Sequence, residues 1–282
     1  MRNFIGVDLG GTNIRAAIVS EDGTIKCMKK SESHPERGAE AVMETMISLI
    51  ESLDGYEECE GIGMGIPGPI DTINGKIIVS TNLPKLIGFP IAEYIENHFH
   101  KPTYMDNDVK VAALGEAVQG AGKDYPIVYY VTISTGVGGA LVIDQKVIGG
   151  QNGHAGEIGN ICIDRNREKY NILNVGAVEN EASGTAVTRK GKAVFGDKIN
   201  HAGDVFDLAR SGDEQALKIV DDMAYDLAMM FCAIGHIIDP HVFVVGGGVM
   251  KGKDVFFEKI GILLPLYDSC RYAAGCIQRS SP

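Results

Sequence analysis

The sequence predicts an α/β protein of two domains, in which one strand-rich pattern occurs twice. The first copy opens the chain with a buried strand at 4–8, a glycine turn and a second strand at 14–20. From residue 127 the pattern returns, with a strand to 133, a second glycine turn and a strand that ends at 143. The length of 282 residues also suits two domains of roughly 100–200 residues each. These observations predict a duplicated α/β fold.

The remaining elements follow from the spacing of apolar residues. This spacing predicts helices at 40–52, 91–99, 109–118, 204–211 and 214–238, and short strands at 24–28, 62–65, 103–107, 146–148 and 241–245, the last strand of the chain. Between the two copies, residues 119–124 are rich in glycine and polar side chains, which is typical of a linker. We therefore expect an N-terminal domain at 1–119 and a C-terminal domain at 120–282.

Charge and composition exclude several classes of protein. The chain has 26 basic and 37 acidic residues, and its net charge of −11 repels nucleic acid and anionic membranes. Its apolar runs are shorter than the roughly 20 residues that a membrane span requires. The six cysteines are scattered and form no C-x-x-C pair, which favours reduced thiols in a cytoplasm. We expect a cytoplasmic protein whose partners are neither nucleic acids nor membranes.

The first glycine turn is a candidate phosphate site. Asp8 ends a strand and is followed by Gly10, Gly11, Thr12 and Asn13. Glycines let backbone amides approach phosphate oxygens, the two polar side chains add donors, and an aspartate could hold the magnesium ion that accompanies a nucleotide. A tight hairpin without a ligand is the alternative for such a turn. Its repetition in the second copy favours a functional site.

Two further glycine segments could also approach a ligand. The second turn contributes Thr135, Gly136, Gly138 and Gly139. A third segment, which alone could be a packing feature, follows the strand at 241–245 and contains Gly246, Gly247 and Gly248. By contrast, the G-x-G-x-x-G match at 63–68 is not a dinucleotide site, because Pro67 and Pro69 leave no helix after it.

Three carboxylates stand at candidate functional positions. Asp108 follows the strand at 103–107, where it either caps the next helix or accepts a proton from a substrate hydroxyl as a general base. Glu157 lies between glycines, and Glu179 is in a similar loop. Taken individually, each glutamate is more often a solvated loop residue. The seven histidines show no metal-binding spacing.

Together these motifs resemble the ROK family of sugar kinases, which belongs to the actin-like ATPase superfamily with its ribonuclease H-like duplicated fold. Seven segments match in order: the phosphate motifs at 8–15 and 134–139, the sugar-side turn at 65–68, the E-N-D-like segment at 106–108, the G-E-x-G motif at 156–159, the E-x-x-A-S-G segment at 179–184 and the adenosine motif at 245–248. Seven motifs in this order are highly specific, although each alone is weak.

The resemblance implies a role for each matched residue. Asp108 would be the catalytic base. The sugar would be bound by Gly68, Asn82, Asn107, Glu157, Asn160 and Glu179. ATP would be bound by Asp8, Gly10, Gly11, Thr12, Asn13, Thr135, Gly136, Gly138, Gly139, Gly246, Gly247 and Gly248, with Asp8 holding Mg²⁺. A homodimer and an active-site cleft between the two domains are also implied.

Two departures from the family pattern stand out. Family members usually carry a histidine after G-E-x-G and a C-x-C-G-x-x-G-C zinc loop, whereas here Asn160 replaces the histidine and Cys162 is the one cysteine within 161–178. We therefore expect no structural zinc and a change in sugar preference. After Val249 the family's closing G-D-x-A-G-x-x-G-A-A helix is not recognisable. We expect an altered or truncated C-terminus with a disordered tail.

The function implied by the resemblance is transfer of the ATP γ-phosphate to a hexose hydroxyl, with O6 of glucose as the first choice. N-acetylmannosamine, fructose and allose are alternative acceptors. A non-catalytic sugar-binding protein remains a third option. A sugar-responsive repressor of the same family is disfavoured by the charge of −11 and by the position of Asp8, which leaves no room for a helix-turn-helix domain ahead of it.

Overall fold

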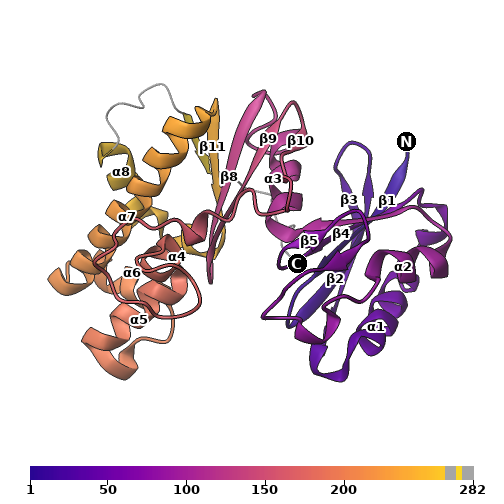
Figure 1. Cartoon of the computed structure of the whole chain (residues 1–282), viewed down its shortest axis with the longest axis horizontal. Helices are drawn as coiled ribbons and strands as arrows, with labels where there is room; N and C mark the ends of the chain where they lie inside the picture. Colours follow the sequence, from indigo (N-terminus) through magenta and orange to yellow (C-terminus); the bar gives the residue numbers. More distant parts are fainter. Residues whose placement is uncertain (264–270, 275–282) are drawn as a thin grey trace. The chain divides into compact units, whose positions relative to one another are not determined.

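The computed structural model describes residues 1–263 and 271–274. The described chain forms two compact units (Figure 1). The first comprises Met1–Ala112 and Gly149–His154, and the second comprises Ala113–Ile148 and the residues from Ala155 onward. The division between domains that carry separate functions, which the sequence places at residues 119 and 120, stays a prediction.

The first unit is built on a five-stranded sheet. Its order is β3 (Ile25–Glu32), β2 (Asn13–Ser20), β1 (Asn3–Leu9), β4 (Ile62–Ile66) and β7 (Thr103–Asn107). The first three strands form an antiparallel meander, and β4 and β7 extend it in parallel with β1. Helix α1 (Ala39–Glu51) packs on β2 and β3, and α2 (Ile91–Phe99) packs on β7. The parallel strands therefore end at one edge of the sheet.

Local sequence explains how the two helices of this unit form. In α1 the buried residues Val42, Met43, Met46 and Ile50 recur at helical spacing and face the core. Helix α2 ends where His100 adopts a left-handed backbone with φ 52°. Pro102 follows two residues later and cannot continue a helix.

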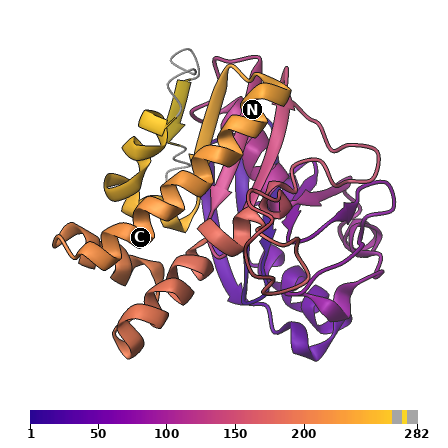
Figure 2. The same ribbon diagram turned by 60° about the vertical axis from the view of Figure 1, so that its left-hand side comes forward.

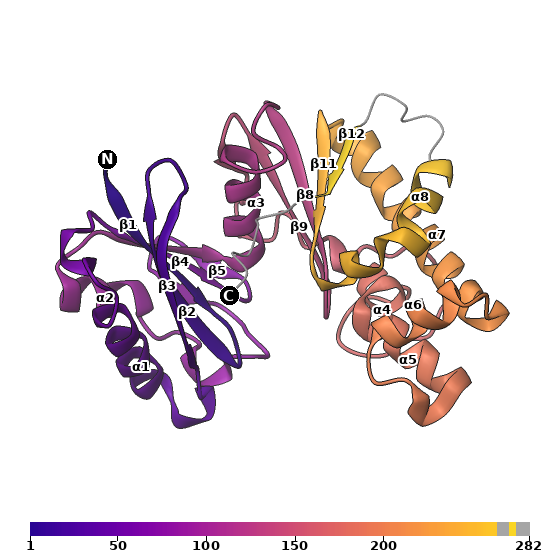
Figure 3. The same ribbon diagram turned by 180° about the vertical axis from the view of Figure 1, so that it is seen from behind.

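The second unit repeats the same sheet. Its order is β10 (Lys146–Val147), β9 (Val137–Ile143), β8 (Ile127–Ile133), β11 (Val242–Gly246) and β12 (Arg271–Ala274). Again an antiparallel meander is extended by two parallel strands, so the predicted duplication is confirmed. Strand β12 corrects the expectation that 241–245 is the last strand, and Figure 3 shows it beside β11. The disordered tail expected at 278–282 lies outside the described residues.

Helices cover the second sheet. They are α4 (Val178–Ala182), α5 (Gly184–Phe195), α6 (Ala202–Arg210), α7 (Glu214–Ile238) and α8 (Lys253–Leu263), while α3 (Asp108–Val118) begins in the first unit. Figure 2 shows α7, the long orange helix, running along this sheet. Asp213 caps α7, because its carboxylate accepts hydrogen bonds from the amides of Gln215 and Ala216, each at 3.0 Å. The helices α4, α5 and α8 were not expected from the sequence.

Each unit has its own hydrophobic core. In the second unit, Phe231 of α7 meets Phe243 of β11 edge to face, with ring centroids 5.2 Å apart. In the first unit, buried aliphatic side chains from the sheet and α1 form a separate cluster. Because each cluster is complete within one unit, each sheet holds its loops in place by its own packing.

Short elements complete the described chain. They are the hairpin β5 (Ile70–Asp71) and β6 (Lys76–Ile77), and the 3-10 turns η1 (Pro35–Arg37), η2 (Tyr56–Glu58), η3 (Pro84–Leu86), η4 (Ile158–Asn160), η5 (Gly196–Lys198) and η6 (Gly248–Gly252). Since the hairpin β5–β6 follows β4 directly, the turn at 63–68 leads into no helix, as expected. Among the residues described, no helix is both long and apolar enough to cross a membrane.

Replacing Phe231 by alanine removes a ring that is only 1% exposed. The variant Phe231→Ala is expected to lower the free energy of unfolding by about 3–5 kcal/mol, because a buried cavity remains. Tyr225→Ala on the exposed face of the same helix is the matched control, with an expected change within about 0.5 kcal/mol. Urea denaturation measures both, and equal losses would contradict this account of the core.

Candidate active site

In the first unit, three neighbouring parallel strands end with candidate site residues that lie side by side in the strand register. Asp8 on β1 lies opposite Gly65 on β4, and Gly65 lies opposite Asp106 on β7. Ligands of open α/β sheets bind outside the carboxyl ends of the strands. The strand register therefore brings the first glycine turn, the sugar-side turn and the segment at 106–108 to the same edge.

Asp8 pairs with Arg15 across the β1–β2 hairpin. The guanidinium Nη1 lies 2.6 Å from Oδ2 of Asp8, and the two side chains are 38% and 53% exposed. An ion pair this exposed stabilises the fold by only about 0–1 kcal/mol. Asp8 is therefore able to exchange its partner for a metal ion at little cost.

The first turn is closed by its own backbone. The amide of Gly10 donates to the carbonyl of Asn13 at 2.8 Å, and the amide of Ser33 donates to the carbonyl of Thr12 at 3.0 Å. Gly11 lies against Asn82, where an added Cβ would be 3.1 Å from that of Asn82. The structure thus places two of the predicted ligands from separate segments, Gly11 and Asn82, in contact.

The sugar-side turn depends on Gly68. Its φ is +108°, and an added Cβ would overlap the carbonyl oxygen of Val79. The carbonyl of Gly68 accepts a hydrogen bond from Nδ2 of Asn107 at 3.0 Å. The side-chain oxygen of Asn107 accepts from the amides of Val109 and Lys110 at 3.0 and 3.3 Å, so Asn107 caps α3. Asn107, which is buried, joins the sugar-side turn to this helix.

Asp108 begins helix α3. An added Cβ on Gly65 would lie 3.5 Å from the Cα of Asp108, so the start of the helix packs on β4. Its Oδ1 accepts a hydrogen bond from the amide of Val109 at 2.9 Å. The positive end of the helix dipole stabilises a carboxylate at this position. Asn107 caps α3, and Asp108 is the first residue of the helix.

In the second unit, the glycine turn is held by the start of α5. The amide of Gly184 donates to the carbonyl of Ser134 at 2.8 Å, and Oγ1 of Thr185 donates to the carbonyl of Thr135 at 2.8 Å. Within the turn, the amide of Ser134 donates to the carbonyl of Gly136 at 2.8 Å. The start of α5 is therefore attached to the turn by hydrogen bonds from both Gly184 and Thr185.

Glu179 links this turn to the loop that carries the G-E-x-G motif. Its Oε2 accepts the amide of Val137 at 2.9 Å, and a side chain on Gly136 would overlap the same carboxylate. A Cβ on Gly159 would lie 3.3 Å from the Cβ of Glu179. With Oε2 bound to the backbone, Oε1 is the atom that Glu179 can offer to a ligand.

The G-E-x-G loop packs backbone to backbone on β9. Gly156 has φ +95°, its carbonyl accepts the amide of Gly139 at 3.0 Å, and an added Cβ would overlap the carbonyl of Gly139. Gly138, the neighbour of Gly139 on β9, pairs with Thr132 of β8. Glu157 is exposed next to this contact. Glycine is required at position 156 because the backbone of the loop lies directly against the backbone of β9.

Asn160 ends the same loop and is held by Asn174. Its Oδ1 accepts the amide of Asn174 at 2.7 Å, and its carbonyl accepts Nδ2 of Asn174 at 2.9 Å. Because the amide of Asn174 must donate, the oxygen of the Asn160 side chain is assigned by this contact. The group that Asn160 can present to a ligand is therefore its Nδ2 donor.

The third glycine segment follows β11. Side chains on Gly246 and Gly247 are excluded, because a Cβ would lie 2.5 Å from Oη of Tyr130 in the first case and would overlap the carbonyl of Ile133 in the second. Gly247 has φ +96°. Gly248 follows and lies near Ser134, whose Oγ would be 3.6 Å from an added Cβ. This segment thus meets the second glycine turn.

A pocket of about 880 Å³ opens at this meeting point. It is lined by Ser134, Thr135, Gly184, Thr185, Thr188, Arg189, Lys192, Asn200, His201, Ala202, Gly203, Phe206, Asp207, Arg210, Gly248, Val249, Lys251 and Gly252. Arg210 is neutralised by Asp254 and Asp207, each at 2.6 Å. Lys192 and Lys251 add positive charge to the wall of a pocket in an acidic chain, which favours an anionic ligand.

Sequence reasoning missed most of this pocket. Thr188, Lys192 and His201 come from α5 and the start of α6, elements whose side chains carry no motif. The one local signal was Ser183, whose hydroxyl accepts the amide of Ala186 at 3.1 Å as an N-cap and so marks the start of α5.

The residues present fit a nucleotide and Mg²⁺ but not the zinc ion of the family pattern. The pocket volume lies within the roughly 300–1,000 Å³ of small-molecule sites and suits a nucleotide. Mg²⁺ commonly takes one or two protein carboxylates and completes its shell with water and phosphate oxygens, which Asp8 satisfies. Zinc does not fit, because Cys162 stands alone within 161–178 and the described residues contain no group of three or more metal-binding side chains. The absence of zinc from the protein stays a prediction.

Two sheets of the same order, each a meander extended by parallel strands, define an actin-like ATPase fold. The sequence model of the ROK family matches residues 4–267, and the chain belongs to the ROK family. A glucokinase of Thermotoga maritima is 31% identical over 267 residues, which cover 90% of this chain and 84% of the relative.

Two further comparisons bear on the site. An N-acetylmannosamine kinase of Yersinia pseudotuberculosis is 32% identical over 253 residues, covering 88% of this chain and 84% of the relative. The crystal structure of a ROK family glucokinase from Streptomyces griseus, in complex with glucose and AMPPNP, is 25% identical. It superposes with a TM-score of 0.80, over 97% of this chain and 94% of that one.

The contact at Gly68 predicts how a methyl group added at this position, as in alanine, changes the stability of the protein. Gly68→Ala is expected to lower the free energy of unfolding by about 2–5 kcal/mol, because left-handed strain adds to overlap with the Val79 carbonyl. Gly55→Ala in the same unit is the control, since Gly55 has φ +87° but nothing within 4 Å of an added Cβ. It is expected to cost about 1–2 kcal/mol. Equal losses in thermal unfolding would show that crowding at Gly68 is not decisive.

Proposed function

We propose that this protein is an ATP-dependent sugar kinase that transfers the γ-phosphate to a hexose hydroxyl. The pocket of the second unit, where the turn at 134–139 meets Gly248, is the observation that carries the proposal. It combines a volume suited to a nucleotide with hydroxyl groups, backbone and positive charge. The family membership and the relatives named above support the same activity.

In this proposal the nucleotide lies in the pocket of the second unit. Thr135, Gly136, Gly138 and Gly139 approach its phosphates, and Gly246, Gly247 and Gly248 approach its adenosine. The proposed phosphate ligands of the first unit are Asp8, Gly10, Gly11, Thr12 and Asn13. Magnesium held by Asp8 would neutralise charge on the phosphates. Backbone hydrogen bonds close both hairpins.

The sugar is bound by groups that the fold leaves available. Glu179 offers Oε1, Glu157 is exposed, and Asn160 offers Nδ2. Carboxylates that accept hydrogen bonds from vicinal hydroxyls form the stronger, charge-assisted type. In the first unit the further proposed sugar ligands are Asn82 and the pair Gly68 and Asn107, which are coupled by a hydrogen bond.

Asp108 acts as the general base. Its carboxylate accepts the proton of the attacking sugar hydroxyl while the oxygen bonds to the γ-phosphorus and ADP leaves. The start of α3 places the positive end of the helix dipole beside this carboxylate. In phosphoryl transfer the base contributes less than alignment of the acceptor oxygen and neutralisation of charge.

Glucose, phosphorylated at O6, is the proposed acceptor. N-acetylmannosamine is the main alternative, because Asn160 stands where the family has a histidine and because one relative acts on that sugar. Fructose and allose are further alternatives. We also propose that the protein works in the cytoplasm as a homodimer.

A coupled assay of ADP release over a panel of these sugars tests the activity. Glucose is expected to give the highest kcat/KM, by about tenfold or more over the other sugars. A higher kcat/KM for N-acetylmannosamine would show that this sugar, and not glucose, is the acceptor, while the proposed phosphoryl transfer would stand. Sugar binding by calorimetry without ADP release would instead support the non-catalytic alternative and contradict the proposal.

The variant Asp108→Asn tests the base. It is expected to lower kcat by about 10²–10⁴-fold with little change in the KM for sugar, because an amide cannot take up the proton. Asp124→Asn, at an exposed position of the segment at 119–124, is the control and should keep full activity. Undiminished activity of Asp108→Asn would remove Asp108 from this role.

A further inference from the structure

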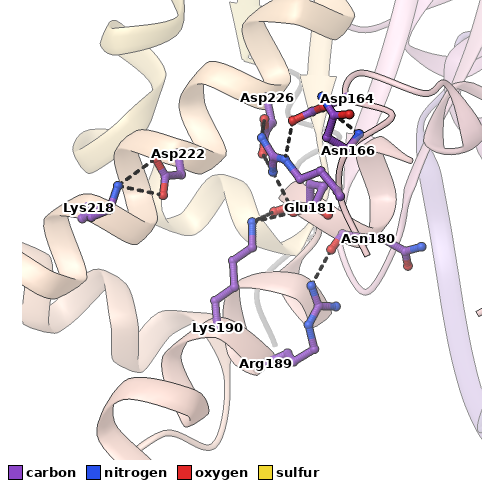
Figure 4. A network of polar contacts seen from close by, with 10 residues as sticks. Asp164, Asn166, Asn180, Glu181, Arg189, Lys190, Lys218, Asp222 and Asp226 are labelled. Atoms are coloured by element: carbon purple, nitrogen blue, oxygen red, sulfur yellow. Dashed lines mark hydrogen bonds and ion pairs between the residues drawn. The ribbon is translucent and has the colours of Figure 1, made fainter. Parts of the chain in front are cut away.

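A cluster of buried charges lies where the loop at 161–177 meets α4 and α7 (Figure 4). Arg167 of this loop reaches Asp226 of α7 with two parallel hydrogen bonds, Nη1 to Oδ2 at 2.9 Å and Nη2 to Oδ1 at 2.8 Å. Its Nη1 also donates to Oε2 of Glu181 on α4 at 2.8 Å. One guanidinium therefore ties the loop to two helices.

The acidic partners are among the most buried charged groups of the described chain. The side chains of Asp226 and Glu181 are 1% and 4% exposed, and that of Arg167 is 28% exposed. Lys190 adds a second cation, with Nζ 3.0 Å from Oε2 of Glu181, and the more exposed Asp164 adds a third carboxylate, 3.3 Å from Nε of Arg167. Burial raises the pKa of Asp226, and the hydrogen bonds from Arg167 oppose this rise.

The loop that Arg167 holds connects two proposed sugar ligands. It runs from Asn160 to the residues just before Glu179. At its base the amide of Ile163 donates to the carbonyl of Gly176 at 2.9 Å, and Asn174 binds Asn160 from within the loop. Movement of the loop would therefore displace Asn160 directly.

This loop coincides with the stretch in which the family pattern has its zinc-binding cysteines. Here that stretch contains Cys162 alone, and the described residues offer no metal-binding group. The loop is irregular between η4 and α4, and it is fixed by backbone hydrogen bonds at its base and by side chains such as Arg167. Of these contacts, the Arg167 cluster is the one that reaches the buried face of α7.

We propose that Arg167 is a positioning residue for sugar binding: with Asp226 and Glu181 it clamps the loop at 161–177 and thereby holds Asn160 and Glu179 in place without a metal ion. This proposal rests on the proposed function for its sugar part. The clamp requires the planar fork of arginine, because a lysine is a point charge that cannot bind Asp226 bidentately and reach Glu181 as well.

Hydrogen exchange and steady-state kinetics on the full chain test the clamp. In Arg167→Met, the backbone amides of 161–177 are expected to exchange about tenfold faster or more, while those of β8 stay unchanged. The KM for the sugar is expected to rise about 10- to 100-fold and the KM for ATP to change less than about twofold. Arg167→Lys should not restore the sugar KM.

Lys218→Met is the matched control on α7. Lys218 makes an exposed ion pair with Asp222 at 3.4 Å, so its loss should change neither exchange nor kinetics. If Arg167→Met fails to fold, the double variant Arg167→Met with Asp226→Leu removes the unpaired buried charge and should restore folding but not loop protection. Metal analysis of the wild type should find no stoichiometric zinc, and a chelator should leave loop exchange unchanged.

Several results would overturn the clamp. Unchanged loop exchange in the folded Arg167 variants would do so, as would equal changes in the KM values for sugar and ATP, or one bound zinc per chain whose removal frees the loop. If the wild type phosphorylates no sugar, the proposed function fails. Loop exchange, which needs no turnover, still decides whether Arg167 holds Asn160 and Glu179.

Discussion

Close contact between backbone segments at glycine is the constraint on which the candidate site residues of each unit depend. Gly68 and Gly156 each have a positive φ, and each lies where a Cβ would overlap a carbonyl oxygen. Gly176 repeats this arrangement at the base of the clamped loop. Because these contacts leave no room for adjustment, they fix the loops, and the loops fix the side chains beside them. The excess of glycine is therefore structural as much as it is a means of approaching phosphate.

Oppositely charged side chains form ion pairs both at the surface and in the interior of the protein. At the surface, Asp8 is held by Arg15 in a weak pair that a metal ion can replace. In the interior, Arg167 and Asp226 form a pair whose disruption would leave a charge without water or partner. Lys192 and Lys251 offset the acidic field of the chain where an anionic ligand would bind. An exposed ion pair costs little free energy to break, whereas the buried pair of Arg167 and Asp226 costs much more and so holds the loop to α7.

The fold was predictable where local sequence decides it. The helix at 91–99 and the strand at 103–107 are confirmed, because a proline separates them and their apolar spacing is clear. Helices α5 and α8 and strand β12 were missed. In α5 glycines and lysines weaken the apolar pattern, since one side of this helix lines the pocket. Strand β12 is four residues long and, among the strands that the structure describes, pairs with β11 alone, so its formation depends on a distant segment.

The sequence by itself determined the duplicated fold, the family, the glycine turns and the candidate residues of the site, because these are encoded by residues close together in the chain. Tertiary structure alone decided which atoms of those residues remain available. It showed that Asn107 caps α3, that Oε2 of Glu179 is taken by Val137, and that Arg167 reaches Asp226. Arg167 and Asp226 are 59 residues apart, and no local pattern reports a pairing that arises only when a loop closes over α7.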